Sequence, residues 1–208
     1  MSTLEDHYDR VNSVTWSKDA TQLASASDNW TVKIWDPTTA QCVSMLKGHR
    51  HRVKSVAWSH DGTRLASASD DRTVKIWDPA AGQCVMTLEG HSHFVSSVIW
   101  SHDATRLASV SSYWPAKSYK RKIWDSATGQ CVSTLEGHSS GVNYSSPTTV
   151  GYGLSSNGTW ITLQGENLLW LPSEYRPSSL AISGPAVSIG CSSGRVLIFT
   201  FSGSNSIS

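Results

Sequence analysis

The chain is poor in charged residues and has no long apolar run. Its 208 residues include 17 Lys or Arg and 16 Asp or Glu, so the formal net charge is only +1. This balance argues against bulk attraction to nucleic acid or to an acidic membrane surface. No apolar run approaches the length of about 18 residues that a membrane helix needs. The first ten residues are polar and carry no apolar signal segment, so we expect a cytoplasmic protein.

Common signatures of cofactor and metal chemistry are also missing. No Gly-x-x-x-x-Gly-Lys-Ser/Thr segment is present, which excludes that phosphate-binding loop. There are only four cysteines, and three of them recur at one spacing, namely Cys42, Cys84 and Cys131. One cysteine per repeat fits neither a zinc cluster nor a disulfide framework. The sequence therefore predicts no cofactor and no metal.

Tryptophan, in contrast, is abundant: ten residues against three phenylalanines. Six tryptophans form two series with a period of about 42 residues: Trp16, Trp58, Trp100 and Trp35, Trp77, Trp124. This period fits either helical HEAT or armadillo arrays or four-stranded propeller blades. A two-residue alternation of side chains, as in Thr73–Trp77, favours strands over helices.

Turn residues divide the second repeat into four predicted strands. The strands are Val53–Ser59, Arg64–Ser69, Thr73–Trp77 and Gln83–Leu88, here called a, b, c and d in that order. In an antiparallel sheet of this kind, the d–a and b–c loops emerge at one end and the a–b and c–d loops at the other. We therefore predict an all-β protein.

These residues carry a family resemblance. The second repeat is similar to a WD40 repeat over His49, Val53-Lys54-Ser55-Val56, Asp61-Gly62, Leu65-Ala66-Ser67, Asp71 and Val74-Lys75-Ile76-Trp77-Asp78. The resemblance covers three repeats, at residues 7–48, 49–90 and 91–135. It implies a WD-repeat β-propeller, a non-catalytic fold that presents surfaces to protein partners.

A narrower resemblance concerns the WD-repeat region of fungal NACHT-type NOD-like receptors. It rests on Trp-Ser-His-Asp at 100–103, on Ser-Ala-Ser-Asp at 67–70 and on Gly-Gln-Cys-Val at 82–85 and 129–132. The segments 167–177 and 189–196 resemble the closing end of such receptors. The resemblance implies a ligand-sensing surface.

The repeat pattern decays after residue 135. Residues 136–201 are interpreted as degenerate C-terminal blades, and 202–208 as a disordered tail. Residues 1–6 match the end of a strand d from a preceding blade. The total is about five blades, so the chain is either an incomplete, open propeller or a small ring in which Ser2–Glu5 closes beside Arg195–Phe201. Open sheet edges would allow self-association.

The resemblance assigns a buried hydrogen-bond chain to His49, Ser67, Asp71 and Trp77. Indole, hydroxyl, imidazole and carboxylate can pass hydrogen bonds along such a chain. A Ser-His-Asp set also occurs in hydrolases, but a set woven into a repeat favours a structural role. The first repeat has Asn29 at the Asp position.

In the third repeat Ser118 stands nearest to the Asp position, and Arg121 falls where a buried valine is expected. We therefore predict that the second repeat is the best formed and that the third blade is distorted. The inserted segment 113–122 mixes basic and aromatic residues. A solvated loop is favoured there over a site for anions or single-stranded nucleic acid.

Histidine pairs spaced like metal ligands, His49-x-His51 and His91-x-His93, are interpreted instead as one framework and one loop histidine each.

The strongest functional signal is variation at the end that carries the d–a and b–c loops. Otherwise similar repeats differ there in charge and size, as when Tyr8 is replaced by Arg50 and then by Ser92. We call the following set the variable face: Tyr8, Asp9, Asn12, Trp30, Arg50, His51, Lys54, Arg72, Ser92, His93, Phe94 and Ser96. A copied framework with one changing end is typical of a modular recognition surface.

The expected function is protein–protein recognition, as a scaffold or a ligand-sensing surface. The alternatives are a cytosolic adaptor of an unrelated pathway and, less favoured, an enzyme that uses the central channel.

Overall fold

The computed structural model describes residues 2–113, 118–138, 152–154, 160–163, 166–171, 177–183, 186–191 and 193–200. Every regular element in these ranges is a strand, and the strands form antiparallel sheets. Over the described residues, no helix has the length and apolarity to cross a membrane. Residues 114–117 of the inserted segment, and the tail at 202–208 that was expected to be disordered, fall outside the described residues.

Each of the three repeats forms one four-stranded sheet, or blade. The first contains β2 (Val11–Trp16), β3 (Leu23–Ser27), β4 (Val32–Asp36) and β5 (Gln41–Leu46). The second contains β6 (Val53–Trp58), β7 (Leu65–Ser69), β8 (Val74–Asp78) and β9 (Gln83–Leu88). The third contains β10 (Val95–Trp100), β11 (Arg106–Tyr113), β12 (Ser118–Asp125) and β13 (Cys131–His138). The strands of the second repeat agree with the sequence prediction to within one residue at each end.

The remaining strands form two further sheets. One has three strands: β14 (Tyr152–Leu154), β15 (Trp160–Leu163) and β16 (Glu166–Trp170). The other joins β17 (Pro177–Ser183), β18 (Ala186–Cys191) and β19 (Arg195–Thr200) to β1 (Ser2–Glu5). Leu4 of β1 lies opposite Val196 of β19, so both ends of the described chain contribute to one blade. The strand pairing expected for a small ring is therefore present.

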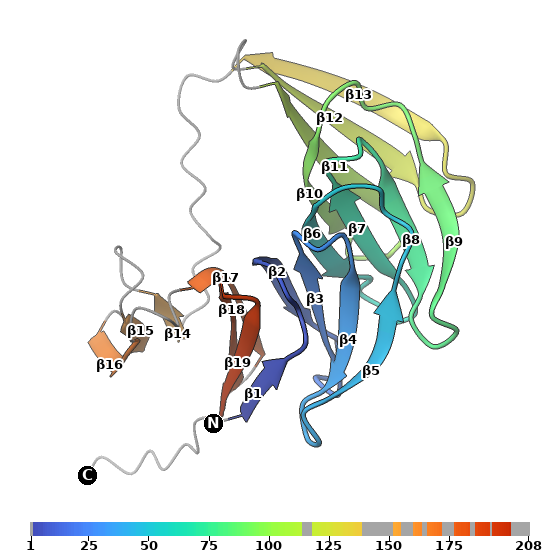
Figure 1. Ribbon diagram of the computed structural model, residues 1–208. Coiled ribbons are helices and arrows are strands. Elements are labelled where there is room, and N and C mark those ends of the chain that lie inside the picture. The colour runs from blue at the N-terminus through green and yellow to red at the C-terminus, as the bar shows by residue number, and fades with distance from the viewer. Residues whose placement is uncertain are drawn as a thin grey trace.

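The four-stranded blades follow one another in an arc, with strand a of each blade on the inner side (Figure 1). The last blade packs on the first through β17 and β2, the first on the second through β2 and β6, and the second on the third through β6 and β10. The described strands thus form an open propeller of about five blades, as the fold prediction expected.

Small side chains allow the blades to pack face to face. The Leu-Ala-Ser-Ala-Ser sequence of β3 and of β7 is buried at every position, because both faces of strand b contact a blade. Trp77 packs against Ala24, Ile34 and Leu46 of the first blade. Trp35 and Trp124 occupy the equivalent places at the neighbouring interfaces. Full burial of each such side chain contributes about 2–3 kcal/mol of hydrophobic stabilisation.

The third blade differs from its sequence prediction in two respects. The inserted segment, expected as a loop, instead lengthens a hairpin: β11 and β12 pair continuously from Arg106 opposite Asp125 to Tyr113 opposite Ser118. Arg121 was expected to be buried, but its side chain is exposed. Exposure removes the desolvation cost that burial of an unpaired guanidinium would carry.

Candidate functional site

A buried hydrogen-bond chain runs through the second blade. The Trp77 indole Nε1 donates to Ser67 Oγ over 2.8 Å, and Ser67 Oγ lies 2.7 Å from His49 Nε2. His49 Nδ1 lies 2.7 Å from Asp71 Oδ2. Since a carboxylate only accepts, Nδ1 donates to it, and a neutral imidazole then accepts at Nε2 from the serine. The four residues assigned by the resemblance are thus in contact.

The Asp71 carboxylate joins this chain to the two loops above it. It also accepts hydrogen bonds from the Arg50 amide at 3.0 Å, from the Thr73 amide at 3.0 Å and from the Thr73 hydroxyl at 2.7 Å. Burial alone would raise the pKa of Asp71, but the bonds from His49, Thr73 and Arg50 outweigh it and hold the pKa well below its usual range. Ser67 is fully buried and bonded to an indole, so it cannot serve as a nucleophile.

The first blade keeps the hydrogen-bond chain, but its histidine donates and accepts in the opposite direction. Trp35 donates to Ser25 Oγ at 2.7 Å, and His7 Nε2 lies 2.7 Å from the same oxygen. Asn29 Nδ2 lies 3.0 Å from His7 Nδ1, while Asn29 Oδ1 accepts from the Thr31 amide and hydroxyl. The amide therefore donates to Nδ1, and His7 carries its proton on Nε2. Burial and the nearby Lys33 lower the pKa of His7 to about 4.

The third blade uses a serine in place of the acid. Trp124 donates to Ser109 Oγ at 2.8 Å, and His91 contacts Ser109 Oγ at 2.7 Å and Ser111 Oγ at 2.9 Å. Sequence counting had pointed to Ser118 at this position, which proved wrong because the insertion lengthens the hairpin and places Ser118 opposite Tyr113. Burial and the nearby Lys122 lower the pKa of His91 to about 4.

The buried hydrogen-bond chain of the second blade lies directly beneath the variable face. The Ser69 hydroxyl donates to the His51 carbonyl at 3.2 Å, and the Asp70 amide donates to the Arg52 carbonyl at 2.9 Å. These bonds tie the d–a loop to the b–c loop in the second blade. The first blade repeats them from Ser27 and Asp28. In these two blades, side chains and amides beneath the face thus fix the backbone of its loops.

An exposed aromatic row crosses three blades on this face. The ring of His51 stacks between Trp30 of the first blade and Phe94 of the third, with centroid distances of 6.3 Å on both sides and interplanar angles of 17° and 20°. Trp30 and Phe94 are each 52% exposed, and Tyr8 near the first blade is 83% exposed. Sequence comparison had selected all four residues but could not show that three of them stack.

Three other residues of the variable face sit at matching bulges in the inner strands. The pairing register shifts at Asn12, Lys54 and Ser96, and such bulges redirect a side chain away from the regular pleat. Asn12 donates to Asp28 Oδ1 at 2.6 Å and to the Val53 carbonyl at 2.9 Å, and Lys54 Nζ lies 3.6 Å from Asp28 Oδ1. Asp28 thus links two blades, a role that sequence comparison missed although the Ser-Asp pair recurs at 69–70.

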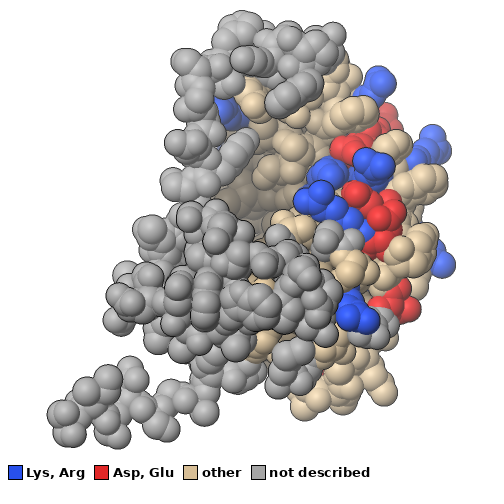
Figure 2. Space-filling view, turned by 60° about the vertical axis from the view of Figure 1, so that its left-hand side comes forward, with Lys and Arg blue, Asp and Glu red and all other residues tan. Residues whose placement is uncertain are grey.

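The acidic side chains of Asp28 and Asp70 are withdrawn from this face, whereas Asp9 is exposed together with several basic side chains. The side chains of Asp28 and Asp70 are only 13% and 15% exposed, whereas that of Arg52 is 56% exposed. Arg50 and Arg72 are also exposed. Figure 2 shows basic and acidic side chains interleaved in a band on one side of the described surface. The outermost charge on the variable face is therefore predominantly positive.

The other members of the variable face are mostly exposed too. Asp9 caps the Arg10 amide at 2.7 Å, and the Ser96 hydroxyl donates to the Val110 carbonyl at 3.2 Å. Ser92 is exposed and His93 is partly buried. All twelve residues therefore lie on the loops and strand starts at one end of the first three blades.

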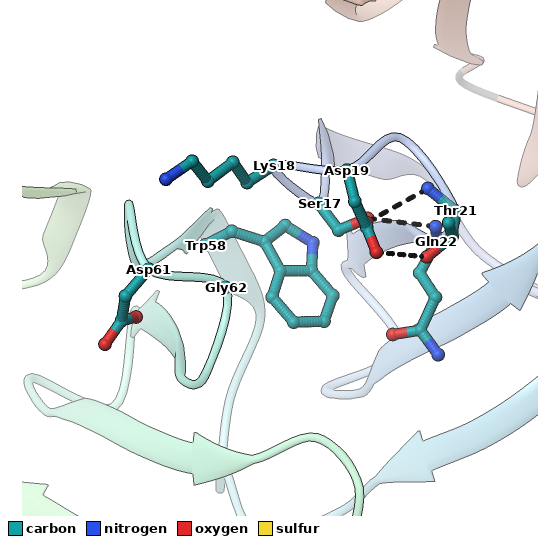
Figure 3. Close-up of a pocket in the computed structure, with 8 residues that line it drawn as sticks. All are labelled: Ser17, Lys18, Asp19, Thr21, Gln22, Trp58, Asp61 and Gly62. Carbon is teal, nitrogen blue, oxygen red and sulfur yellow. Dashed lines mark hydrogen bonds between the residues drawn. The ribbon is translucent and has the colours of Figure 1, made fainter.

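The opposite end of the blades carries a small cleft. It has a volume of about 390 Å³ and lies between the a–b loops of the first two blades, with the Trp58 ring between Asp19 on one side and Asp61 and Gly62 on the other (Figure 3). Asp19 is occupied by bonds from the Ser17 hydroxyl and from Thr21. The polar groups of the cleft are therefore largely satisfied within their own turns.

In the described ranges, no group of three or more His, Cys, Asp or Glu side chains is placed to hold a metal ion. His49 and His91 use both ring nitrogens in the buried chains, so neither forms a metal pair with His51 or His93. The four cysteines are free thiols.

Fold and site together define a class: a repeat propeller whose blades are braced by Trp–Ser–His chains. The family model described as "WD domain, G-beta repeat" matches residues 1–36, 40–78 and 82–113, which is just over half of the chain. The chain therefore belongs to the WD-repeat family, whose members are generally non-catalytic modules that bind protein partners.

One relative is the "Vegetative incompatibility protein HET-E-1" of Podospora anserina. It is 45% identical over 58 residues, which cover 28% of this chain and 4% of that protein. The chain thus matches only a small part of that relative. A fungal relative agrees with the narrower resemblance noted in the sequence.

Proposed function

We propose that the chain is a cytoplasmic recognition module that binds protein partners through its variable face, as a scaffold or as a ligand-sensing surface like that of fungal NOD-like receptors. The observation that carries this proposal is the exposed row of Trp30, His51 and Phe94 across three blades. Exposed aromatic side chains on a rigid support provide large contact area at low entropic cost.

Backbone geometry supports the same face. Trp30 and Arg72 occupy the same turn position in the first two blades, with φ of 70° and 72°. A side chain in this left-handed region costs about 1–2 kcal/mol, which glycine would avoid. Large side chains kept at strained and exposed positions are typical of functional surfaces.

Charge further defines the partner. Because Arg50, Arg52 and Arg72 project while Asp28 and Asp70 are withdrawn, the face favours an acidic segment. The aromatic row adds a place for an apolar or aromatic anchor beside those charges. The proposed partner is thus a protein segment that combines carboxylates with one or two large apolar side chains.

A pull-down with two matched triple variants tests this proposal. Trp30→Ala, His51→Ala and Phe94→Ala together remove the aromatic row. The control triple, Val43→Ser, Val85→Ser and Val132→Ser, alters one exposed apolar side chain per blade on the outer strands, where each is 50–53% exposed.

Proteins captured specifically by the wild-type chain should be lost with the first triple, retained with the control and released by raised salt. Retention with the first triple, or loss only with the control, contradicts the proposal.

A further inference from the structure

Two histidines meet at the end of the blades opposite to the variable face. His60 and His102 occupy the same repeat position, within Ser-His-Asp at 59–61 and at 101–103. Their a–b loops belong to the second and third blades, and their ring centroids are only 3.9 Å apart with an interplanar angle of 42°. The first blade has Lys18 at this position. The pair therefore forms only where two adjacent repeats both carry the histidine.

Both imidazoles have their ring nitrogens available. His60 and His102 are exposed, and within the part of the chain that the structure describes their one recorded interaction is this ring contact. The framework histidines differ, because His49 and His91 each use both nitrogens in buried hydrogen bonds. Two adjacent imidazoles with open nitrogens are a donor set that transition metals prefer.

The loops hold the two histidines in place. Asp61 accepts from the Ser59 hydroxyl at 2.5 Å, the Thr63 amide at 3.0 Å and the Thr63 hydroxyl at 2.9 Å. Asp103 repeats the first and second of these bonds at 2.6 and 3.1 Å. These bonds use the carboxylates within their own turns, so the imidazoles are the groups left to face a ligand.

The same two turns supply a favourable field. Asp61 and Asp103 are exposed carboxylates, and each lies one residue from a histidine of the pair. Negative charge close to a site favours a bound cation.

We propose that His60 and His102 jointly bind one divalent first-row transition metal ion, of the class of Zn²⁺ and Cu²⁺, which links the second blade to the third. In a tetrahedral site with metal–nitrogen bonds of about 2.0–2.1 Å, two imidazole nitrogens lie about 3.3 Å apart. With ring centroids 3.9 Å apart, one nitrogen of each ring can lie at about this separation. Two protein ligands leave the remaining coordination positions to water, so binding is reversible.

Titration of the full chain, free of any polyhistidine tag, with Zn²⁺ tests the pair by calorimetry. The wild-type chain should bind one ion, and His60→Gln and His102→Gln should each weaken binding by about tenfold or more. His93→Gln, a histidine of the opposite end, is the matched control and should leave affinity unchanged. Cu²⁺ should bind more tightly than Zn²⁺ and show two nitrogen ligands by electron paramagnetic resonance.

Hydrogen exchange then tests the link between blades. Zn²⁺ should slow exchange in residues 59–63 and 101–105 together in the wild-type chain, and in neither segment of the two variants. Absence of Zn²⁺ binding, unchanged affinity in either histidine variant, or protection of one segment alone would overturn the proposal.

Discussion

The two ends of the blades handle their polar groups in different ways. At the a–b end, each of the three repeats forms the same turn, in which an aspartate accepts from a serine two residues before it and from the amide two residues after it. At the variable face, equivalent positions carry Tyr8, Arg50 and Ser92, or Trp30 and Arg72. The loops of both ends are ordered, but only one end is copied.

The difference lies in where the bracing groups are located. At the a–b end an exposed aspartate holds each turn together with the serine before it, so changing the aspartate removes hydrogen bonds. At the variable face, buried residues such as His49, Ser69 and Asp71 hold the loops from beneath. Outward side chains can then vary between repeats at little cost in stability, which suits a surface that must acquire specificity.

The bracing groups are not equally strong in the three blades. Only the second repeat ends its chain in a carboxylate, whereas Asn29 and Ser111 take that place in the first and third. Hydrogen bonds to charged groups contribute more than those between neutral groups. The variable face therefore has its firmest support at Arg50, His51 and Arg72.

Removal of this carboxylate should have the largest effect on stability. Asp71→Ala leaves the His49 ring, the Arg50 amide and the Thr73 amide without their acceptor, which should destabilise the second blade by about 3 kcal/mol. Hydrogen exchange of residues 49–73 measures the loss. Asn29→Ala serves as the comparison in the first blade and should cost about 1 kcal/mol; equal losses would contradict the proposed difference.

Acidification should weaken the first and third blades before the second. His7 and His91 have pKa values lowered from 6.5 to about 4, so between these values the unfolded chain binds more protons than the folded chain. Stability therefore falls as pH falls through this window, by about 2 kcal/mol for each histidine at pH 5. The pKa of Asp71 is held below its usual range, so its contribution persists down to about pH 4.

Hydrogen exchange at pH 7 and pH 5, corrected for the intrinsic rate, checks this order. Exchange should increase around residues 7–31 and 91–111 more than around residues 49–73. An equal or larger increase in the second blade would refute it.

A substitution at the a–b end should have a smaller effect on stability and should leave partner recognition intact. Asp61→Ala removes the acceptor of Ser59 and Thr63 and should cost about 1 kcal/mol. Urea unfolding measures the cost, and a pull-down measures recognition. Loss of captured partners without unfolding would show that this end also binds them.

The smallest effect on stability should come from the variable face itself. Trp30→Gly relieves a positive φ of 70°, which offsets the greater backbone entropy of glycine, so stability should rise by about 0.5 kcal/mol or less. Partner binding should nevertheless fall, because the stack with His51 is lost. A clear loss of stability would assign Trp30 a structural role.

Local features were predictable from the sequence because they depend on neighbouring residues. Alternation and turn residues located the strands of the second blade, and repeat comparison selected the residues of the variable face. The position of Trp77 in the repeat, together with the family resemblance, also identified its hydrogen-bond partners.

Features that depend on contacts between blades were not predictable. The stack of Trp30, His51 and Phe94 joins three repeats, and the contact of His60 with His102 joins two. In the third blade, residue counting failed because the insertion lengthened β11 and β12 instead of forming only a loop. Arg121 keeps the pairing position of the buried Val74 but is exposed.

Photo-crosslinking from the two ends tests the central claim most directly. A photoreactive phenylalanine analogue replaces Trp30 in one protein and Lys18, an exposed residue of the copied end, in another. The account predicts partner crosslinks from position 30 and none from position 18. Crosslinks from position 18 alone, or equally from both, would contradict the assignment of recognition to the variable face.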